Sequence, residues 1–175
     1  MDISLLAYEA LIAAVVVERC VELVLSERHA RTLLARGATE HGAGHYGPMV
    51  ALHTAFILGC ALEPLLADRP FIPALGIPML VVALAAQSLR WWAISTLGVH
   101  WNTRVIVLPS AVRVSAGPYR WFPHPNYVAV IAEGIALPLV HSAWITALVF
   151  TVLNAWLLSV RIRTEDAALA MMRPA

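Results

Sequence analysis

The sequence predicts an all-α integral membrane protein, and its composition and the spacing of its apolar runs carry that prediction. Hydrophobic residues make up 60% of the 175 residues and charged residues only 13%. The mean hydropathy is +0.74. Such values are far from those of soluble domains and are typical of chains with several membrane spans. We expect one helical bundle of five transmembrane helices, a single domain over residues 1–175.

Five apolar runs are separated by polar or proline-containing segments. They are Ile3–Leu25, Met49–Leu66, Ile72–Trp92, Asn126–Val140 and Ala143–Val160, with approximate bounds. The first run has no basic segment or small-residue cleavage site near it, so we expect a retained span and not a signal peptide. The fourth run is short for a complete crossing, so the last two runs are expected to form a tilted or partly shielded helical hairpin.

Two connections hold most of the polar residues. Ser26–Gly47 contains arginines, histidines and four closely spaced glycines, and it is expected to be a mobile loop or lid. In the longest connection, Leu97–Pro125, we expect Val105–Pro109 and Val112–Val114 to pair as a short hairpin.

The stretch around which the chain is organised runs Gly117-Pro118-Tyr119-Arg120-Trp121-Phe122-Pro123-His124-Pro125-Asn126-Tyr127. Its three prolines predict a shaped loop without helix, followed by a helix capped by Asn126. The free amides of such a helix start favour an anion. Glu133 lies two turns further on the same face, and an unpaired acid in an apolar span usually has a functional reason. Arg90, Arg104 or a neighbouring histidine could instead pair with it. The alternative is a capped helix with a stray acid.

The arginines are distributed unequally over the two ends of the expected bundle. Arg69 stands alone at one end, and the other end collects Arg28, Arg31, Arg36, Arg104, Arg113, Arg120, Arg161, Arg163 and Arg173. Positively charged connections stay in the cytoplasm, so we expect an inner-membrane protein with its loop, lid and C-terminus cytoplasmic. A site at that face could receive a polar molecule from the cytosol and an apolar one from the bilayer.

Several function classes are disfavoured. The net charge is +1 and there is no lysine, so no basic patch for nucleic acid is expected. Cys20 and Cys60 fall in apolar runs, where cysteines are usually small core residues and not a disulfide or metal set. We therefore expect no metal site.

The loop suits a ligand that carries both a cation and a carboxylate. Tyr119, Trp121 and Tyr127 offer aromatic faces to a cation, while His124 and the helix start at Asn126 could hold an anion. S-adenosylmethionine has both a sulfonium and a carboxylate.

Three segments carry a resemblance to a known family. Gly117-Pro118-Tyr119, His124-Pro125-Asn126-Tyr127 and Arg163-Thr164-Glu165-Asp166 resemble the motifs of the isoprenylcysteine carboxyl methyltransferase family, membrane enzymes that use S-adenosylmethionine. The resemblance covers about residues 97–166. It implies that the cofactor is bound by Gly117, Tyr119, His124, Pro125, Asn126, Tyr127, Arg163 and Glu165.

Two residues depart from the family pattern. Pro123 stands where the family usually has arginine, so that role is expected to move to Arg120 or to be lost, and Ala129 replaces the usual glycine. The His-Pro-Asn-Tyr run followed by Glu133 resembles a bacterial branch thought to O-methylate alkylresorcinol or alkylpyrone lipids.

By position, Glu133, His45, His53 and Arg120 are left to act on the acceptor, a lipophilic small molecule or a prenylcysteine-type group. A carboxylate is already ionised at neutral pH, whereas a phenol, with a pKa of about 10, benefits from a base. A spare acid and two histidines therefore favour a hydroxyl acceptor, although both histidines could be purely structural.

Two other functions remain open at this point. A haem or quinone carrier would need histidines on facing helices, yet only His53 of the seven histidines falls clearly within a span. A membrane sterol-type reductase resembles this family in fold, but its nicotinamide cofactor is expected to need a larger polar domain.

Overall fold

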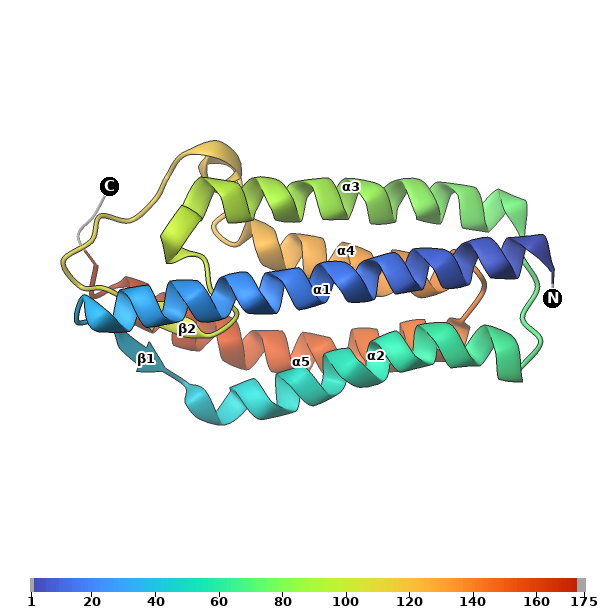
Figure 1. Cartoon of the computed structure of the whole chain (residues 1–175), viewed down its shortest axis with the longest axis horizontal. Coiled ribbons are helices and arrows are strands. Elements are labelled where there is room, and N and C mark those ends of the chain that lie inside the picture. The colour runs from blue at the N-terminus through green and yellow to red at the C-terminus, as the bar shows by residue number, and fades with distance from the viewer. Residues whose placement is uncertain (1, 173–175) are drawn as a thin grey trace.

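The structure is a computed structural model that describes residues 2–172. Five long helices lie alongside one another and alternate in direction, so the N-terminus lies at one end of the bundle and the C-terminus at the other (Figure 1). The helices are α1 (Ile3–Ala35), α2 (Tyr46–Leu66), α3 (Pro73–Leu97), α4 (Pro125–Leu139) and α5 (Trp144–Leu169). The mostly helical architecture expected from composition is confirmed.

A two-stranded antiparallel sheet ties two connections together near the C-terminal end of the bundle (Figure 1). Strand β1 (Thr39–His41) pairs with β2 (Val105–Val107), with Thr39 opposite Val107. Of the two segments expected to pair as a hairpin, Val105–Pro109 supplies β2, whose strand partner is β1, and Val112–Val114 forms no strand and has only an isolated bridge at Val112. All three residues of β2 are buried, and β1 supplies the hydrogen bonds that a buried strand edge requires.

Helix α1 extends ten residues beyond the span expected for it, so most of the expected lid is helix. The inward stripe continues through Ser26, Ala30 and Leu33, which are buried at helical spacing. The polar residues that suggested a loop lie on the opposite face. The helix ends before Gly37, which adopts a φ of 87° that suits glycine.

Two more local expectations need correction around the proline-rich loop. Gly117–Arg120 forms a short 3₁₀-helix, η3, where no helix was expected, because Pro118 is acceptable in a first turn. Helix α4 begins at Pro125 with His124 as its N-cap residue, so Asn126 is not the cap. Further short helices are η1 (Ala43–His45) and η2 (Gly98–His100).

Within residues 2–172, three helical segments are long and apolar enough to cross a membrane: Ala43–Leu66, Pro73–His100 and Trp144–Leu169. Helix α4 is apolar but shorter. Helix α1 carries Glu9, Glu18, Arg19 and Glu22. Large apolar side chains such as Leu58, Val81 and Leu148 are exposed on the outside of the bundle, as a membrane environment requires.

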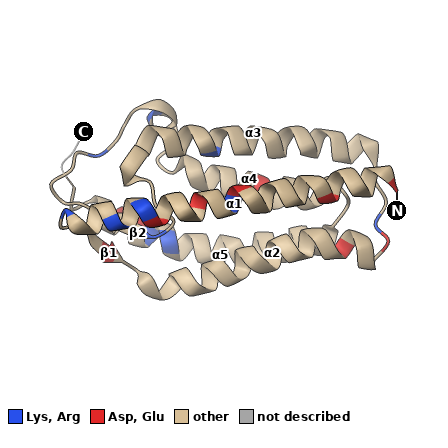
Figure 2. Ribbon diagram, viewed as in Figure 1, with Lys and Arg blue, Asp and Glu red and all other residues tan. Residues whose placement is uncertain are grey.

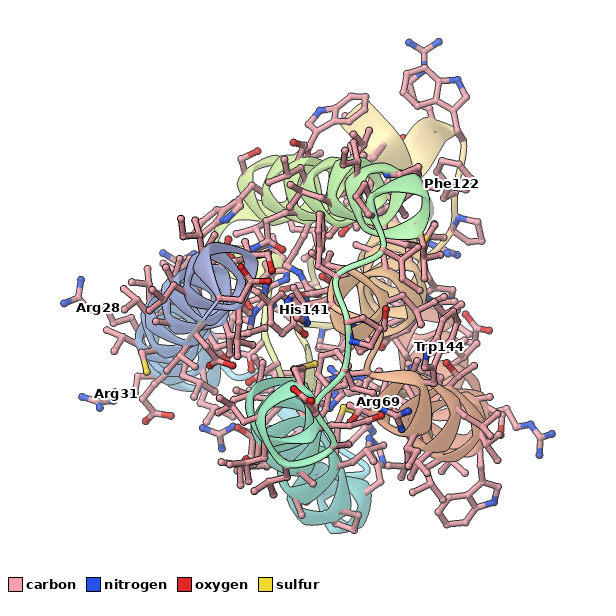
Figure 3. The ribbon with its side chains drawn as sticks, turned by 90° about the vertical axis from the view of Figure 1, so that its right-hand side faces the viewer. Arg28, Arg31, Arg69, Phe122, His141 and Trp144 are labelled. Atoms are coloured by element: carbon pink, nitrogen blue, oxygen red, sulfur yellow. The ribbon has the colours of Figure 1, made fainter. Side chains whose placement is uncertain are left out.

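Basic residues gather at the end that carries β1, β2 and the C-terminus, whereas Arg69 lies at the opposite end (Figure 2). Seen along the bundle from the Arg69 end, His141 lies near the centre while Arg28 and Arg31 point outward (Figure 3). The largest core cluster packs between the helices, with members that include Tyr8, Phe56, Leu137 and Phe150. Cys60 is buried and Cys20 is exposed, and both are free.

Candidate active site

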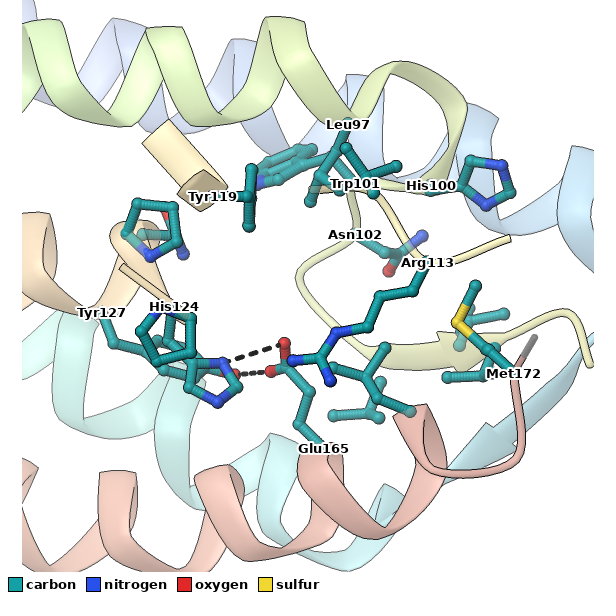
Figure 4. Close-up of a pocket in the computed structure, with 18 of the residues that line it drawn as sticks. Leu97, His100, Trp101, Asn102, Arg113, Tyr119, His124, Tyr127, Glu165 and Met172 are labelled. Atoms are coloured by element: carbon teal, nitrogen blue, oxygen red, sulfur yellow. Dashed lines mark hydrogen bonds and ion pairs between the residues drawn. The ribbon is translucent and has the colours of Figure 1, made fainter. Parts of the chain in front are cut away.

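A cavity of about 410 Å³ lies at the end of the bundle that carries the C-terminus (Figure 4). We call it the polar cavity, because its lining includes His100, Asn102, Arg104, Arg113, Tyr119, Arg120, His124, Asn126, Tyr127, Arg161 and Glu165. Its walls come from β2, from the segment between η3 and α4, and from the last turns of α5. Its volume falls in the range of small-molecule sites, about 300–1,000 Å³.

One chain of polar contacts crosses this cavity. The hydroxyl of Tyr127 donates a hydrogen bond to the Glu165 carboxylate. The same hydroxyl accepts one from Nε of Arg161 at 2.7 Å. His124 places Nδ1 3.4 Å from Glu165 and Nε2 2.9 Å from Asp166. Figure 4 shows His124 and Tyr127 directed at Glu165, and Arg113 extended into the same cavity.

The charge of His124 follows from these neighbours. Its hydrogen bond to Glu165 raises the pKa of His124 above its ordinary value, and partial burial opposes the shift. The ring also stacks on Tyr127, with centroids 5.3 Å apart. Burial raises the pKa of the Tyr119 phenol, so that hydroxyl stays neutral at physiological pH. The polar cavity therefore offers a histidine whose charged form is favoured by Glu165, beside neutral aromatic rings.

A second cavity of about 440 Å³ lies among α1, α2 and α4. We call it the apolar cavity, because most of its lining is aliphatic or aromatic, including Phe56, Ile57, Val130, Phe150 and Leu158. Val16 and Leu23 from α1 and Leu58 from α2 also line it and are exposed on the bundle surface. The apolar cavity therefore reaches the outside of the bundle between these two helices.

The two cavities share a wall, which lies at the N-terminal end of α4. Its residues line both cavities and are Trp101, Asn102, Asn126, Tyr127 and Arg161. A molecule in either cavity would therefore contact these residues.

A buried charge cluster of Glu18, Arg19, Glu22, Arg90 and Glu133 lies along the apolar cavity. Glu133 accepts a hydrogen bond from Arg90 and lies 3.5 Å from a guanidinium nitrogen of Arg19. Arg19 also binds Glu22 at 2.7 Å. Of the partners considered for Glu133, Arg90 is therefore the one that the structure supports, and guanidiniums from α1 and α3 together satisfy its buried charge.

The structure brings most of the residues expected to bind the cofactor to one place. Those that line the polar cavity are Tyr119, His124, Pro125, Asn126, Tyr127 and Glu165. Arg120 lines it as well, with its guanidinium 5.9 Å from the centroid of the Trp121 ring. His53 and Glu133, both expected to act on the acceptor, line the apolar cavity.

Three expected site residues lie outside both cavities. Arg163 is exposed on α5. Gly117 has a φ of 57°, and a Cβ there would lie 2.6 Å from Thr96 Oγ1, so its role is to pack η3 against α3. His45 lies in the turn after β1, where a Cβ on Gly42 would approach its Nδ1 to 2.7 Å.

Arg161, which sequence reasoning explained as a membrane-side anchor, is buried in the shared wall. The signal that identifies it is helical phase. Arg161 and Glu165 are four residues apart and share a face of α5, whereas Arg163 is rotated by roughly 200°. That argument requires a helix that continues through the tail, which the sequence analysis did not expect.

These features define a class of protein: a helical bundle with three candidate membrane spans and with one polar and one apolar cavity that share lining residues. Comparison with known proteins narrows the class. The model of the isoprenylcysteine carboxyl methyltransferase family matches residues 79–171, more than half of the chain. The chain therefore belongs to this family, and membership supports a membrane methyltransferase.

Two curated relatives cover nearly the whole chain. YpbQ of Bacillus subtilis, an uncharacterized protein, is 41% identical over 160 residues, which are 91% of this chain and 94% of the relative. An uncharacterized protein of Haemophilus influenzae is 28% identical over 165 residues, 93% of this chain and 94% of the relative.

Proposed function

We propose that the protein is an S-adenosylmethionine-dependent O-methyltransferase that acts on a lipophilic acceptor at the cytoplasmic face of the inner membrane. The observation that carries the proposal is the wall shared by the polar and apolar cavities. A methyl group can pass from a polar cofactor to an apolar acceptor only where the two molecules touch. In this proposal the polar cavity binds the cofactor and the apolar cavity binds the acceptor.

The residues of the polar cavity fit S-adenosylmethionine, which supplies an electrophilic methyl group on a positively charged sulfur. His124, charged through its contact with Glu165, and the first turn of α4 suit the cofactor carboxylate. The rings of Tyr119 and Tyr127 suit the sulfonium. Arg113 and Arg120 lie on the same lining and can contact further polar groups.

The apolar cavity contains a side chain that a hydroxyl acceptor would need and a carboxylate acceptor would not. His53 lines it and can take up a proton. A carboxylate is already ionised at neutral pH, whereas a phenol with a pKa of about 10 benefits from such a base. A phenolic or enolic lipid, as in the alkylresorcinol and alkylpyrone branch, is the acceptor we favour, ahead of a prenylcysteine-type carboxylate.

A hydroxyl acceptor must give up a proton, and we propose that His53 is the general base that accepts it. His53 Nδ1 lies 2.9 Å from the Met49 carbonyl, to which it donates, so Nε2 keeps its lone pair. Glu133 is less suited to be the base, because guanidinium donors already contact its oxygens. In the reaction the acceptor oxygen bonds to the methyl carbon, the methyl–sulfur bond breaks with its electron pair left on sulfur, and the proton moves to His53.

The proposal includes five crossings within one domain. The three long apolar segments would be three of these transmembrane helices, and α1 and α4 would be the other two. The arginine-rich end of the bundle and the C-terminus would lie in the cytoplasm. The lipid tail would lie in the apolar cavity and leave between α1 and α2 toward the bilayer.

The test is a methylation assay with purified protein in lipid nanodiscs, using methyl-labelled S-adenosylmethionine. Pentadecylresorcinol serves as the phenolic lipid and acetylfarnesylcysteine as the carboxylate. We expect labelled product from the phenolic lipid, identified by mass. Product from the carboxylate alone would move the acceptor to the prenylcysteine class, and binding of cofactor without product from any lipid extract would contradict a transferase.

The same assay tests His53. We expect His53→Gln to lower turnover of the phenolic lipid by about 10²-fold, with the loss shrinking as pH approaches the phenol pKa of about 10. A loss that is equal at every pH would exclude His53 as the base.

A further inference from the structure

Two asparagines, Asn102 and Asn126, lie in the wall shared by the cavities. Their side-chain oxygens differ in whether they have hydrogen-bond partners within the part of the chain that the structure describes. Both the oxygen and the nitrogen of the Asn102 amide are hydrogen-bonded within the protein. Its Oδ1 accepts hydrogen bonds from Ser26 Oγ at 3.0 Å and from the Arg104 amide at 2.8 Å. Its Nδ2 donates to the Ser26 carbonyl at 2.9 Å. Asn102 therefore holds a connection against α1, and its oxygen already has two hydrogen-bond donors.

Asn126 lines the same two cavities, but its Oδ1 is buried and has no hydrogen-bond partner within residues 2–172. Its neighbours are already engaged. The Tyr127 hydroxyl is bound by Arg161 and Glu165, and a terminal nitrogen of Arg161 lies 3.2 Å from Met49 Sδ. A buried carbonyl oxygen without a partner is unfavourable, so its presence at this point calls for a ligand group.

The chemistry of Oδ1 decides which ligand group it can meet. A carbonyl oxygen carries partial negative charge and only accepts hydrogen bonds, so it would repel the cofactor carboxylate, which suits His124 and the amides of α4 instead. It would attract a sulfonium and the polarised C–H bonds of its methyl group. Its place in the shared wall is also where a transferred methyl group must cross.

We propose that Asn126 Oδ1 contacts the sulfonium methyl group and aims it through the shared wall into the apolar cavity. This inference rests on the proposed function and adds the point of transfer to it. When the methyl group moves to the acceptor oxygen, sulfur keeps the electron pair of the broken bond and becomes a neutral thioether. The attraction to Oδ1 then disappears, so Asn126 distinguishes cofactor from product.

The test compares two ligands that differ by that methyl group and its charge. S-adenosylmethionine and S-adenosylhomocysteine are titrated into wild type, Asn126→Leu and Asn126→Asp by calorimetry. We expect Asn126→Leu to weaken binding of S-adenosylmethionine by roughly 3- to 10-fold while binding of S-adenosylhomocysteine is unchanged. Asn126→Asp should shift the ratio of the two affinities in the opposite direction, toward S-adenosylmethionine.

Asn102→Leu is the matched control. It should lower the thermal unfolding temperature and change both affinities by the same factor, because Asn102 is structural. If Asn126→Leu also changes both affinities equally, or neither, the assignment of Asn126 is wrong although the proposed function stands. If wild type binds neither ligand, the proposed function fails and the inference fails with it.

Discussion

The hydroxyl of Tyr127 is the residue-scale feature on which the polar cavity depends. It links the guanidinium of Arg161 to the carboxylate of Glu165, two groups of α5 that lie one helical turn apart. Arg161 is buried in the bundle. Charges in such a place are stable only while their hydrogen-bond partners are kept. The tyrosine is therefore structural as well as part of the cavity wall.

Removing that hydroxyl should destabilise the fold. Tyr127→Phe leaves Arg161 Nε and one oxygen of Glu165 without this partner, which costs about 1–3 kcal/mol when the groups are buried. The thermal unfolding temperature should fall accordingly. Tyr46→Phe changes the same atoms on a tyrosine outside this chain of contacts and should have little effect. An equal fall in both variants would contradict the role given to Tyr127.

The histidine at the start of α4 should make stability depend on pH. The pKa of His124 is raised in the folded state by Glu165. The stabilisation that charged His124 adds to the free energy of unfolding is then complete below the unfolded pKa of about 6.5. It is lost as pH rises through the higher pKa of the folded state. The unfolding temperature of wild type should decline over that window, and His124→Gln should remove part of the decline. Identical pH profiles would argue against a charged His124.

Most of the residues that sequence reasoning assigned to the cofactor do line the polar cavity, because the motif that carries them is local. Sequence reasoning offered Arg90 among the possible partners of Glu133 but could not choose between them and missed Arg19, since these residues come from other helices and only packing brings them together. It also chose Arg163 over Arg161. Two basic residues that close together are distinguished only by which face of a helix they occupy.

At the scale of elements, the order and approximate positions of the five helices could be predicted, and their ends could not. Helix α1 runs on to Ala35 and α5 to Leu169 because a narrow inward stripe continues under a polar exterior. Hydropathy averages over both faces and ends the helix too early. The pairing of β1 with β2 was also missed, because two three-residue strands far apart in sequence leave no local signal.

The contact between α4 and α5 depends on one glycine. A Cβ on Gly134 would lie 2.6 Å from Phe150 Cδ1, so Gly134→Ala should push the ring away and cost about 1–3 kcal/mol. Gly47→Ala in α2 is the control, since nothing lies within 4 Å of a Cβ there. Denaturation in detergent measures both. If Gly134→Ala leaves the free energy of unfolding unchanged, α4 and α5 are packed more loosely than described.

At the scale of the whole molecule, the bundle has a basic, cavity-bearing end and an apolar outside. The polar cavity lies at the end where most arginines gather, and the apolar cavity opens between α1 and α2. Under the proposed function, a water-soluble cofactor would reach the shared wall from the cytosol and a lipid would reach it from the bilayer. Composition predicted the membrane setting, but the junction of two cavities arises only from the packed bundle.

The orientation of the bundle can be measured directly. Reporter domains fused after Arg69 and after the last residue should report opposite sides of the membrane, with the C-terminal reporter in the cytoplasm. The physical reason is that arginine-rich connections are retained on that side. Reporters on the same side would exclude an odd number of crossings between them.

The central claim is that the polar cavity binds S-adenosylmethionine, and calorimetric titration of that cofactor into the purified protein tests it most directly. We predict saturable binding that weakens about tenfold or more in His124→Ala and in Glu165→Gln, since each loses a charged hydrogen bond at the cavity. Arg163→Ala, altered on the exposed face of the same helix, should bind as wild type does. Binding that is absent in wild type, or equal in all four proteins, would contradict the claim.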